Sequence, residues 1–89
     1  MSYAIEFARR AQKQLAELPA DLRRRMGARI DALAENPRPA GVIKMQGAQD
    51  TYRLRVGDWR ILYEIQDLRL VVYVLRVGHR REIYRERGA

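Results

Sequence analysis

The sequence predicts an α+β fold in which an N-terminal strand and a helical hairpin precede an antiparallel sheet, with the helices on one face. Before residue 36, apolar residues recur at helical spacing on either side of Pro19, after a short alternating run. Beyond residue 50, β-branched and aromatic residues predominate and are interrupted by turn residues. The chain has 89 residues, and we expect residues 1–89 to form a single domain.

The N-terminal part is predicted to form one strand and two helices. Apolar and polar residues alternate over residues 3–7, which indicates a strand. Two amphipathic stripes follow, one before and one after Pro19: Ala8, Ala11, Leu15 and Leu18, then Leu22, Met26, Ile30 and Leu33. Pro19 ends the first helix and fits the first position of the second, which Pro37 and Pro39 terminate.

The C-terminal part is predicted to form strands over residues 42–45, 51–56, 59–66 and 69–77. Gly57-Asp58 suits a two-residue type II′ hairpin loop, because glycine readily adopts the positive φ that this turn requires at its first position. Asp67-Leu68 is a weaker signal for a second two-residue loop, since it lacks a glycine.

These two loops determine which side chains share a face of the sheet. With both loops in place, Arg55 lies opposite Arg60, and Leu62 lies opposite Tyr73. One face is then almost wholly apolar and is expected to lie under the helices. The other face, here called the arginine face, carries Arg53, Arg55, Arg60, Leu62, Glu64, Val71, Tyr73, Leu75 and Val77.

The arginine face indicates an anionic ligand. Arg55 and Arg60 are predicted to lie directly opposite one another, and like charges in that position cost up to ~1 kcal/mol. Guanidinium groups suit phosphates, and the aliphatic and aromatic neighbours Leu62 and Tyr73 suit bases, so the face is predicted to contact a nucleic acid. The alternative is a solvated surface with no specific ligand, on which Glu64 neutralises one of the arginines.

Composition narrows the class of partner. Lys+Arg is 18 against 11 Asp+Glu, so the net charge is +7 and a polyanion or an acidic protein is expected. There is no cysteine and one histidine, so neither a disulfide framework nor a metal site is predicted, and no cofactor is expected. No apolar run approaches the ~18 residues of a membrane span, and no signal peptide is apparent, so we expect a cytoplasmic protein without membrane contacts.

Two runs of sequence carry a resemblance to a known family. The first covers residues 52–65 (YRLRVGDWRILYEI) and the second residues 75–84 (LRVGHRREIY). Together they resemble the RelE/ParE superfamily of bacterial and archaeal type II toxins, and the match extends over nearly the whole chain. The resemblance implies a sheet-and-hairpin fold related to small microbial ribonucleases.

Candidate site residues follow from the resemblance together with the charged and aromatic residues of the arginine face and the C-terminal run. The predicted catalytic residues are Arg55, Arg60, Arg80 and Tyr84, and the predicted RNA-binding residues are Lys44, Arg53, Tyr73 and Arg81. The best-known RelE members have lysines where this chain has Arg53 and Arg55. Arginine is almost never deprotonated in a protein, so the identity of the general base stays open. His79 is a candidate acid or base because its unperturbed pKa is about 6.5, whereas the alternative is a solvated histidine without a role.

For function, the resemblance implies the toxin of a type II toxin–antitoxin system. Such a toxin is a ribosome-dependent endoribonuclease, or mRNA interferase, that cleaves mRNA in the A site and inhibits translation. Its partners are a cognate antitoxin that neutralises it, the ribosome with its rRNA, mRNA, and operator DNA only indirectly through the antitoxin. A ParE-like inhibitor that binds DNA gyrase without nuclease activity is the alternative. Arg60, Arg80 and Tyr84 favour the nuclease, because a gyrase binder needs no phosphate-centred cluster.

Overall fold

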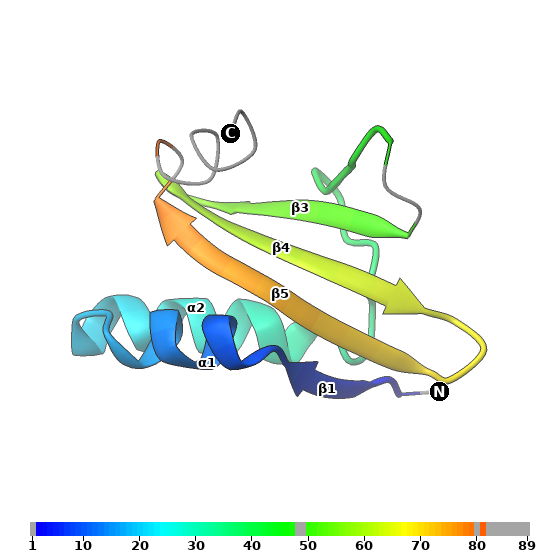
Figure 1. Cartoon of the computed structure of the whole chain (residues 1–89), viewed down its shortest axis with the longest axis horizontal. Coiled ribbons are helices and arrows are strands. Elements are labelled where there is room, and N and C mark those ends of the chain that lie inside the picture. The colour runs from blue at the N-terminus through cyan, green and yellow to red at the C-terminus, as the bar shows by residue number, and fades with distance from the viewer. Residues whose placement is uncertain (1, 48–49, 80, 82–89) are drawn as a thin grey trace.

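The computed structural model describes residues 2–47, 50–79 and 81. Its strands form one sheet in the order β1-β5-β4-β3-β2, and the two helices pack against one face of that sheet (Figure 1). The elements follow the chain as β1 (Ala4–Phe7), α1 (Arg9–Ala16), α2 (Ala20–Ala32), β2 (Ile43–Lys44), β3 (Thr51–Val56), β4 (Trp59–Gln66) and β5 (Val71–His79). The α+β architecture with helices on one face is therefore confirmed.

The helical hairpin turns at Pro19 as predicted, but the second helix begins one residue later than predicted. Pro19 is the N-cap of α2, with extended backbone angles, and Ala20 is the first helical residue. Asp21 lies in the first turn of α2, where the helix dipole favours a negative charge. The buried residues of the hairpin include Ala11 from α1 and Met26 from α2, both on the apolar stripes that the sequence predicts.

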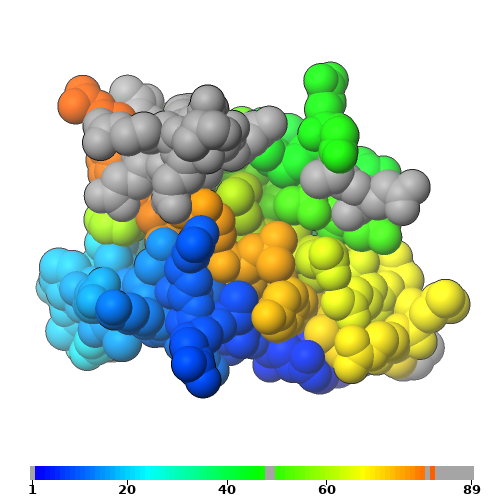
Figure 2. All heavy atoms as spheres, viewed as in Figure 1, coloured from blue at the N-terminus to red at the C-terminus, as the bar shows by residue number. Residues whose placement is uncertain are grey.

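The sheet is antiparallel from β2 to β5, as predicted, and β1 is added at its edge in parallel with β5. β1 pairs only with residues 71–74 of β5, so residues 75–79 of β5 extend past the end of β1. There α1 takes its place: Val77 N–H donates a 2.7 Å hydrogen bond to Gln14 Oε1. Figure 2 shows the atoms of β1 and α1 (blue) against those of β5 (orange).

The β3–β4 hairpin has the predicted two-residue loop. Val56 pairs with Trp59 and Arg55 with Arg60. Gly57 has a φ of 62°. This is the positive value that a type II′ turn requires at its first central residue.

The β4–β5 turn differs from the predicted loop at Asp67-Leu68. Gln66 pairs with Val71, so residues 67–70 form the connection, and Leu70 adopts a φ of 56°. The Leu70 N–H donates to Asp67 O at 3.3 Å, which closes this longer turn. The prediction is wrong here because no glycine in the sequence indicates the position of the residue with positive φ.

A β-bulge in β5 shifts the register once more. The pairing passes from Tyr63–Val74 to Leu62–Arg76, which leaves Leu75 as the extra residue. An extra residue of this kind breaks the alternation of side chains along the strand. All residues of β5 beyond Leu75 therefore lie on the face opposite to the one predicted for them.

Val77 shows the consequence of the bulge. It was predicted on the arginine face, whereas it pairs with Ile61 and is only 1% exposed. The core lies between the helices and the sheet, and Val77 belongs to it. Its buried members are Ala11, Leu18, Met26, Ile30, Leu33, Tyr52, Leu54, Val56, Ile61, Tyr63, Ile65, Val72, Val74 and Val77. Neither helix in the described part of the chain is long and apolar enough to cross a bilayer.

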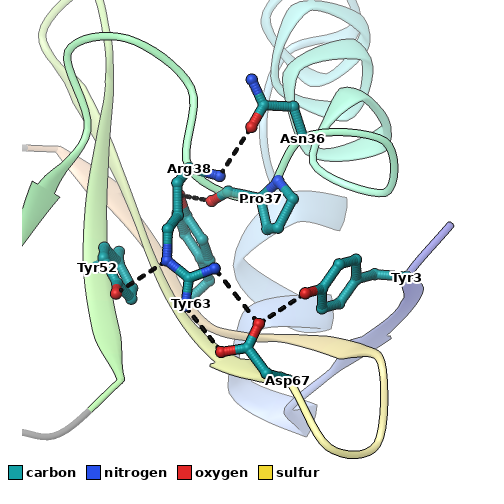
Figure 3. Close-up of polar contacts among 7 residues, drawn as sticks. All are labelled: Tyr3, Asn36, Pro37, Arg38, Tyr52, Tyr63 and Asp67. Atoms are coloured by element: carbon teal, nitrogen blue, oxygen red, sulfur yellow. Dashed lines mark hydrogen bonds and ion pairs between the residues drawn. The ribbon is translucent and has the colours of Figure 1, made fainter. Parts of the chain in front are cut away.

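A polar cluster at the β4–β5 turn ties the chain after α2 to the sheet (Figure 3). Arg38 donates to both carboxylate oxygens of Asp67, at 3.3 and 2.8 Å, and to the Tyr52 hydroxyl at 3.2 Å. Tyr3 donates its hydroxyl hydrogen to Asp67 at 2.6 Å, which attaches the chain before β1 to the same group. The hydrogen bonds from Arg38 and then Tyr3 hold the pKa of the Asp67 carboxyl below its usual range.

Candidate nucleic-acid interface

The centre of the arginine face is the pair Arg55 and Arg60, which lie directly opposite one another on β3 and β4. Both side chains turn toward the same backbone carbonyl in the hairpin loop. Arg60 Nη1 donates to Gly57 O at 3.3 Å, and Arg55 Nε lies 3.5 Å from that oxygen. Arg60 Nη1 also donates to Trp59 O at 3.2 Å. The tight loop therefore orients two guanidinium groups toward one region of space.

Arg60 is buried although it carries a permanent charge. The residue is 5% exposed and is the one charged residue in the described core. Its Nε atom is buried and has no hydrogen-bond partner among the described residues. A buried charge that lacks full pairing is costly, so most buried polar groups in proteins are satisfied. A guanidinium group with such an unused donor is suited to bind an anionic ligand.

Arg53 extends the cationic surface along β3, and Leu62 lies opposite it on β4. Leu62 is 7% exposed and gives this part of the surface an apolar floor. Leu62 has a second neighbour on β5, because the bulge places Arg76 opposite it. Directly opposed residues of antiparallel strands share a face, so Arg76 belongs to the arginine face. Sequence reasoning missed Arg76 because regular alternation along β5 assigned it to the core side.

Tyr73 lies on the arginine face, as predicted, but near its far end. It pairs with Glu64, which is separated from Arg60 by Leu62 in the alternation along β4. The Oε1 atom of Glu64 accepts a 2.7 Å hydrogen bond from Gln66 Nε2. The RNA-binding role of Tyr73 stays a prediction.

The predicted RNA-binding residue Lys44 is not on the arginine face. It pairs with Tyr52, whose side chain belongs to the core side, and it is exposed at the two-residue edge strand β2. Arg81 is exposed, and its backbone N–H lies 3.4 Å from His79 Nδ1. Arg80 and Tyr84, which the sequence assigns to catalysis, lie outside the described residues.

His79 does not share the face of Arg60, contrary to the expectation that a straight strand through Gly78 would give. The bulge pairs His79 with Trp59 and Gly78 with Arg60. The rings of His79 and Trp59 meet edge to face with their centroids 5.6 Å apart. Both line a groove of about 490 Å³ between α2 and the β3–β4 turn, on the helix-covered side. An acid–base role for His79 on a phosphate held by Arg60 is therefore not supported by this geometry.

The arginine face concentrates positive charge, with Arg55 exposed to solvent and Arg60 buried. Burial, and to a smaller extent the charge of Arg10, lowers the pKa of the Arg76 guanidinium. The two opposed arginines and Arg76 come from three adjacent strands. Fixed guanidinium groups of this kind can bind a phosphate and stabilise charge that develops on it during a reaction. Among the described residues no group of three metal-ligating side chains is present.

Comparison with known proteins assigns the chain to a family. The family described as "ParE toxin of type II toxin-antitoxin system, parDE" matches residues 5–84. The chain is 32% identical over 90 residues to the mRNA interferase toxin RelE of Escherichia coli, covering 97% of this chain and 94% of that protein. It is 33% identical over 89 residues to Toxin RelG of Mycobacterium tuberculosis, covering 96% and 99% of the two chains.

Solved structures agree with the sequence comparison. The fold is similar to that in the intact E. coli RelBE toxin–antitoxin complex, with a TM-score of 0.79, 28% identity, and coverage of 88% of this chain and 96% of that one. It is equally similar to that in the archaeal RelE–RelB complex from Pyrococcus horikoshii, with a TM-score of 0.79, 32% identity, and coverage of 90% and 97%. The chain therefore belongs to the RelE/ParE superfamily of type II toxins.

Proposed function

We propose that this protein is the toxin of a type II toxin–antitoxin pair, and that it cleaves mRNA on the ribosome in the cytoplasm. The observation that carries the proposal is the buried Arg60 opposite Arg55, on a face that also carries Arg53. A relative of nearly the same length, 32% identical, bears the name mRNA interferase. Structures of similar toxins with their antitoxins support a cognate antitoxin as the second partner.

The chemistry that these residues support is transfer of a phosphoryl group within RNA. The 2′-oxygen attacks the adjacent phosphorus, the bond to the 5′-oxygen breaks, and a 2′,3′-cyclic phosphate remains. Arg55 and Arg60 would stabilise the negative charge that accumulates on the phosphorane oxygens, an effect worth about 100- to 1,000-fold per donor. The proton lost by the 2′-hydroxyl must leave and the 5′-oxygen must gain one. We assign the second transfer to the Tyr84 hydroxyl, with Arg80 donating a hydrogen bond to the leaving oxygen without losing its proton.

The lack of a strong base among the described residues of the arginine face supports a dependence on the ribosome. Arginine does not lose its proton, and His79 lies on the other face of the sheet. A ribosome that holds the mRNA in place would supply orientation instead, which is worth roughly 7–11 kcal/mol at best. The protein then has to supply mainly charge stabilisation, for which the arginine face is suited.

Primer extension tests the proposal. An mRNA is translated in a purified system with and without the protein, and the same mRNA is also incubated with the protein in the absence of ribosomes. Truncations within codons that require both the protein and ribosomes are expected. An intact mRNA under all conditions would refute the nuclease function.

Inhibition of DNA gyrase is the second candidate, because the matching family is described as a ParE toxin. A supercoiling assay with purified gyrase separates the two candidates. Inhibited supercoiling together with intact mRNA would support the gyrase inhibitor. Normal supercoiling together with truncated mRNA would support the endoribonuclease.

A further inference from the structure

The bulge in β5 brings Arg76 next to the catalytic pair. Arg76 lies opposite Leu62, and the next position of β5 on this face, Gly78, lies opposite Arg60. Arg60 and Arg76 are thus diagonal neighbours, a relation that separates residues by about 7–8 Å. Gly78 has no side chain, so β5 places nothing on the sheet surface beside Arg60. Arg60 and Arg76 therefore border the same strip of the arginine face, in which Arg60 and Gly78 are buried and Arg76 is half-buried.

A second cation reaches Arg76 from α1. The helix packs along the edge of β5 beyond the end of β1, where Gln14 binds the Val77 N–H (Figure 2). Arg10 lies close enough for its charge to lower the pKa of Arg76, in addition to the effect of burial. The Nε and Nη2 atoms of Arg76 are shielded from solvent. Two like charges at a partly desolvated position produce a positive potential that favours an anion.

We propose that Arg76 and Arg10 bind the RNA phosphate adjacent to the scissile phosphate, so that the RNA backbone crosses the sheet from β3 toward α1. This inference rests on the proposed function. Arg55 and Arg60 are directly opposed, at a separation of about 4.5–5.5 Å between side-chain origins, and can converge on one phosphate. Arg76 is one row farther along the strands and is placed for a neighbouring phosphate.

The surroundings of Arg76 favour RNA over an acidic protein segment. Cations from three strands and one helix lie in sequence across the sheet, and Leu62 lies between Arg53 and Arg76 as an apolar surface. Cations in series with an apolar surface between them suit a strand that alternates phosphates and bases. Planar guanidinium groups also match the oxygens of phosphate in a bidentate manner.

The test removes the charge of the Arg76 side chain and the charge of one RNA phosphate, first separately and then together. Ribosomes are programmed with mRNA whose linkage on the 5′ or the 3′ side of the cleaved bond is a neutral methylphosphonate. Single-turnover cleavage is then measured for the wild type and for Arg76→Gln. Each change alone is expected to raise the half-saturating protein concentration about tenfold, the loss typical of one charged hydrogen bond. At one of the two linkages, the combined effect should be no larger than either alone.

Controls separate this contact from general charge effects and from folding. Arg69→Gln removes the same charge from the exposed β4–β5 turn and should not change the half-saturating concentration. Arg76→Lys should retain much of the binding, because it keeps the charge. Arg10 is at an exposed helical position, so Arg10→Gln is used to repeat the test if Arg76→Gln does not fold.

The outcomes are distinct. The inference would be overturned if the effects of Arg76→Gln and of the neutral linkage were additive at both linkages. Unchanged cleavage by both Arg76→Gln and Arg10→Gln would also overturn it. Normal cleavage by Arg76→Gln combined with loss of neutralisation by the antitoxin would assign Arg76 to the antitoxin interface and also overturn it. If wild-type protein fails to cleave unmodified mRNA, the proposed function itself fails, and this result is visible before any variant is examined.

Discussion

Replacement of Arg60 by methionine should remove activity without weakening the fold. Methionine has a similar length and no charge, so it can fill the space of the buried side chain. Arg60 is 5% exposed, lies opposite Arg55, and has a buried Nε without a hydrogen-bond partner among the described residues. These features indicate that the arginine is not retained for stability. The free energy of unfolding of Arg60→Met measures that directly.

The opposing contributions are similar in size. The substitution relieves the cost of one unsatisfied buried donor, about 1–3 kcal/mol, and the repulsion across the strands, up to about 1 kcal/mol. It also loses the two hydrogen bonds from Arg60 to Gly57 O and Trp59 O, at 3.3 and 3.2 Å. Bonds from a charged donor contribute about 1.5–3 kcal/mol each, but removal of the buried charge also relieves a desolvation penalty of several kcal/mol. We therefore expect the free energy of unfolding to change by no more than about 1 kcal/mol.

The assay is urea denaturation monitored by circular dichroism. An unchanged dependence of the unfolding free energy on urea concentration shows that the two transitions are comparable. Ile61→Ala is the matched control, because Ile61 is the next residue of β4 and is fully buried. It should lose about 2–5 kcal/mol. A loss of about 3 kcal/mol or more in Arg60→Met would refute the reasoning, since it would identify Arg60 as a structural cation whose removal disrupts the core.

Three further predictions concern the bulge, the polar cluster and His79. Val77→Ala should lower the free energy of unfolding by about 1.5–3 kcal/mol in urea denaturation, because Val77 is 1% exposed; a negligible loss would contradict the bulge. Asp67 has a lowered pKa in the folded state, so its contribution to stability is present above the unfolded carboxyl pKa of about 3.9 and is lost as the pH falls through the folded pKa. The difference in unfolding free energy between wild type and Asp67→Asn should accordingly be present at neutral pH and shrink on acidification, and a difference independent of pH would exclude this role. His79→Ala should cleave mRNA within about threefold of the wild-type rate, because His79 lies on the face opposite Arg60; a loss of about a hundredfold, typical of a general acid or base, would restore it as a candidate.

The β3–β4 hairpin could be predicted from the sequence because local chemistry determines it. Gly57 adopts a positive φ, which permits a loop of two residues. Once that loop is known, the alternation of side chains places Arg55 opposite Arg60 without further information. The arginine pair was therefore accessible to sequence reasoning, and so was the apolar face under the helices.

The rest of the site depends on features that local sequence does not specify. Leu70 takes a positive φ that non-glycine residues seldom adopt, in a turn closed by its own N–H to Asp67 O and joined to β1 by the bond from Ala4 N–H to Leu70 O. Leu75 is an extra residue in an otherwise regular apolar strand, and nothing in its side chain indicates a bulge. The longer turn leaves the predicted faces unchanged, whereas the bulge moved Val77 and His79 to the core side and brought Arg76 to the arginine face. The parallel pairing of β1 with β5 is a contact between the ends of the chain, which periodicity cannot reveal.

The most direct test of the arginine face as an RNA-cleaving surface is the single-turnover rate of mRNA cleavage on programmed ribosomes. Wild-type protein is compared with Arg60→Met, which is expected to be folded, at saturating protein concentration. A fall in the rate of about 100- to 1,000-fold, with cleavage by the wild type confined to the ribosome-bound codon, is the expected result. Cleavage by Arg60→Met at the wild-type rate would contradict the assignment of this face to catalysis.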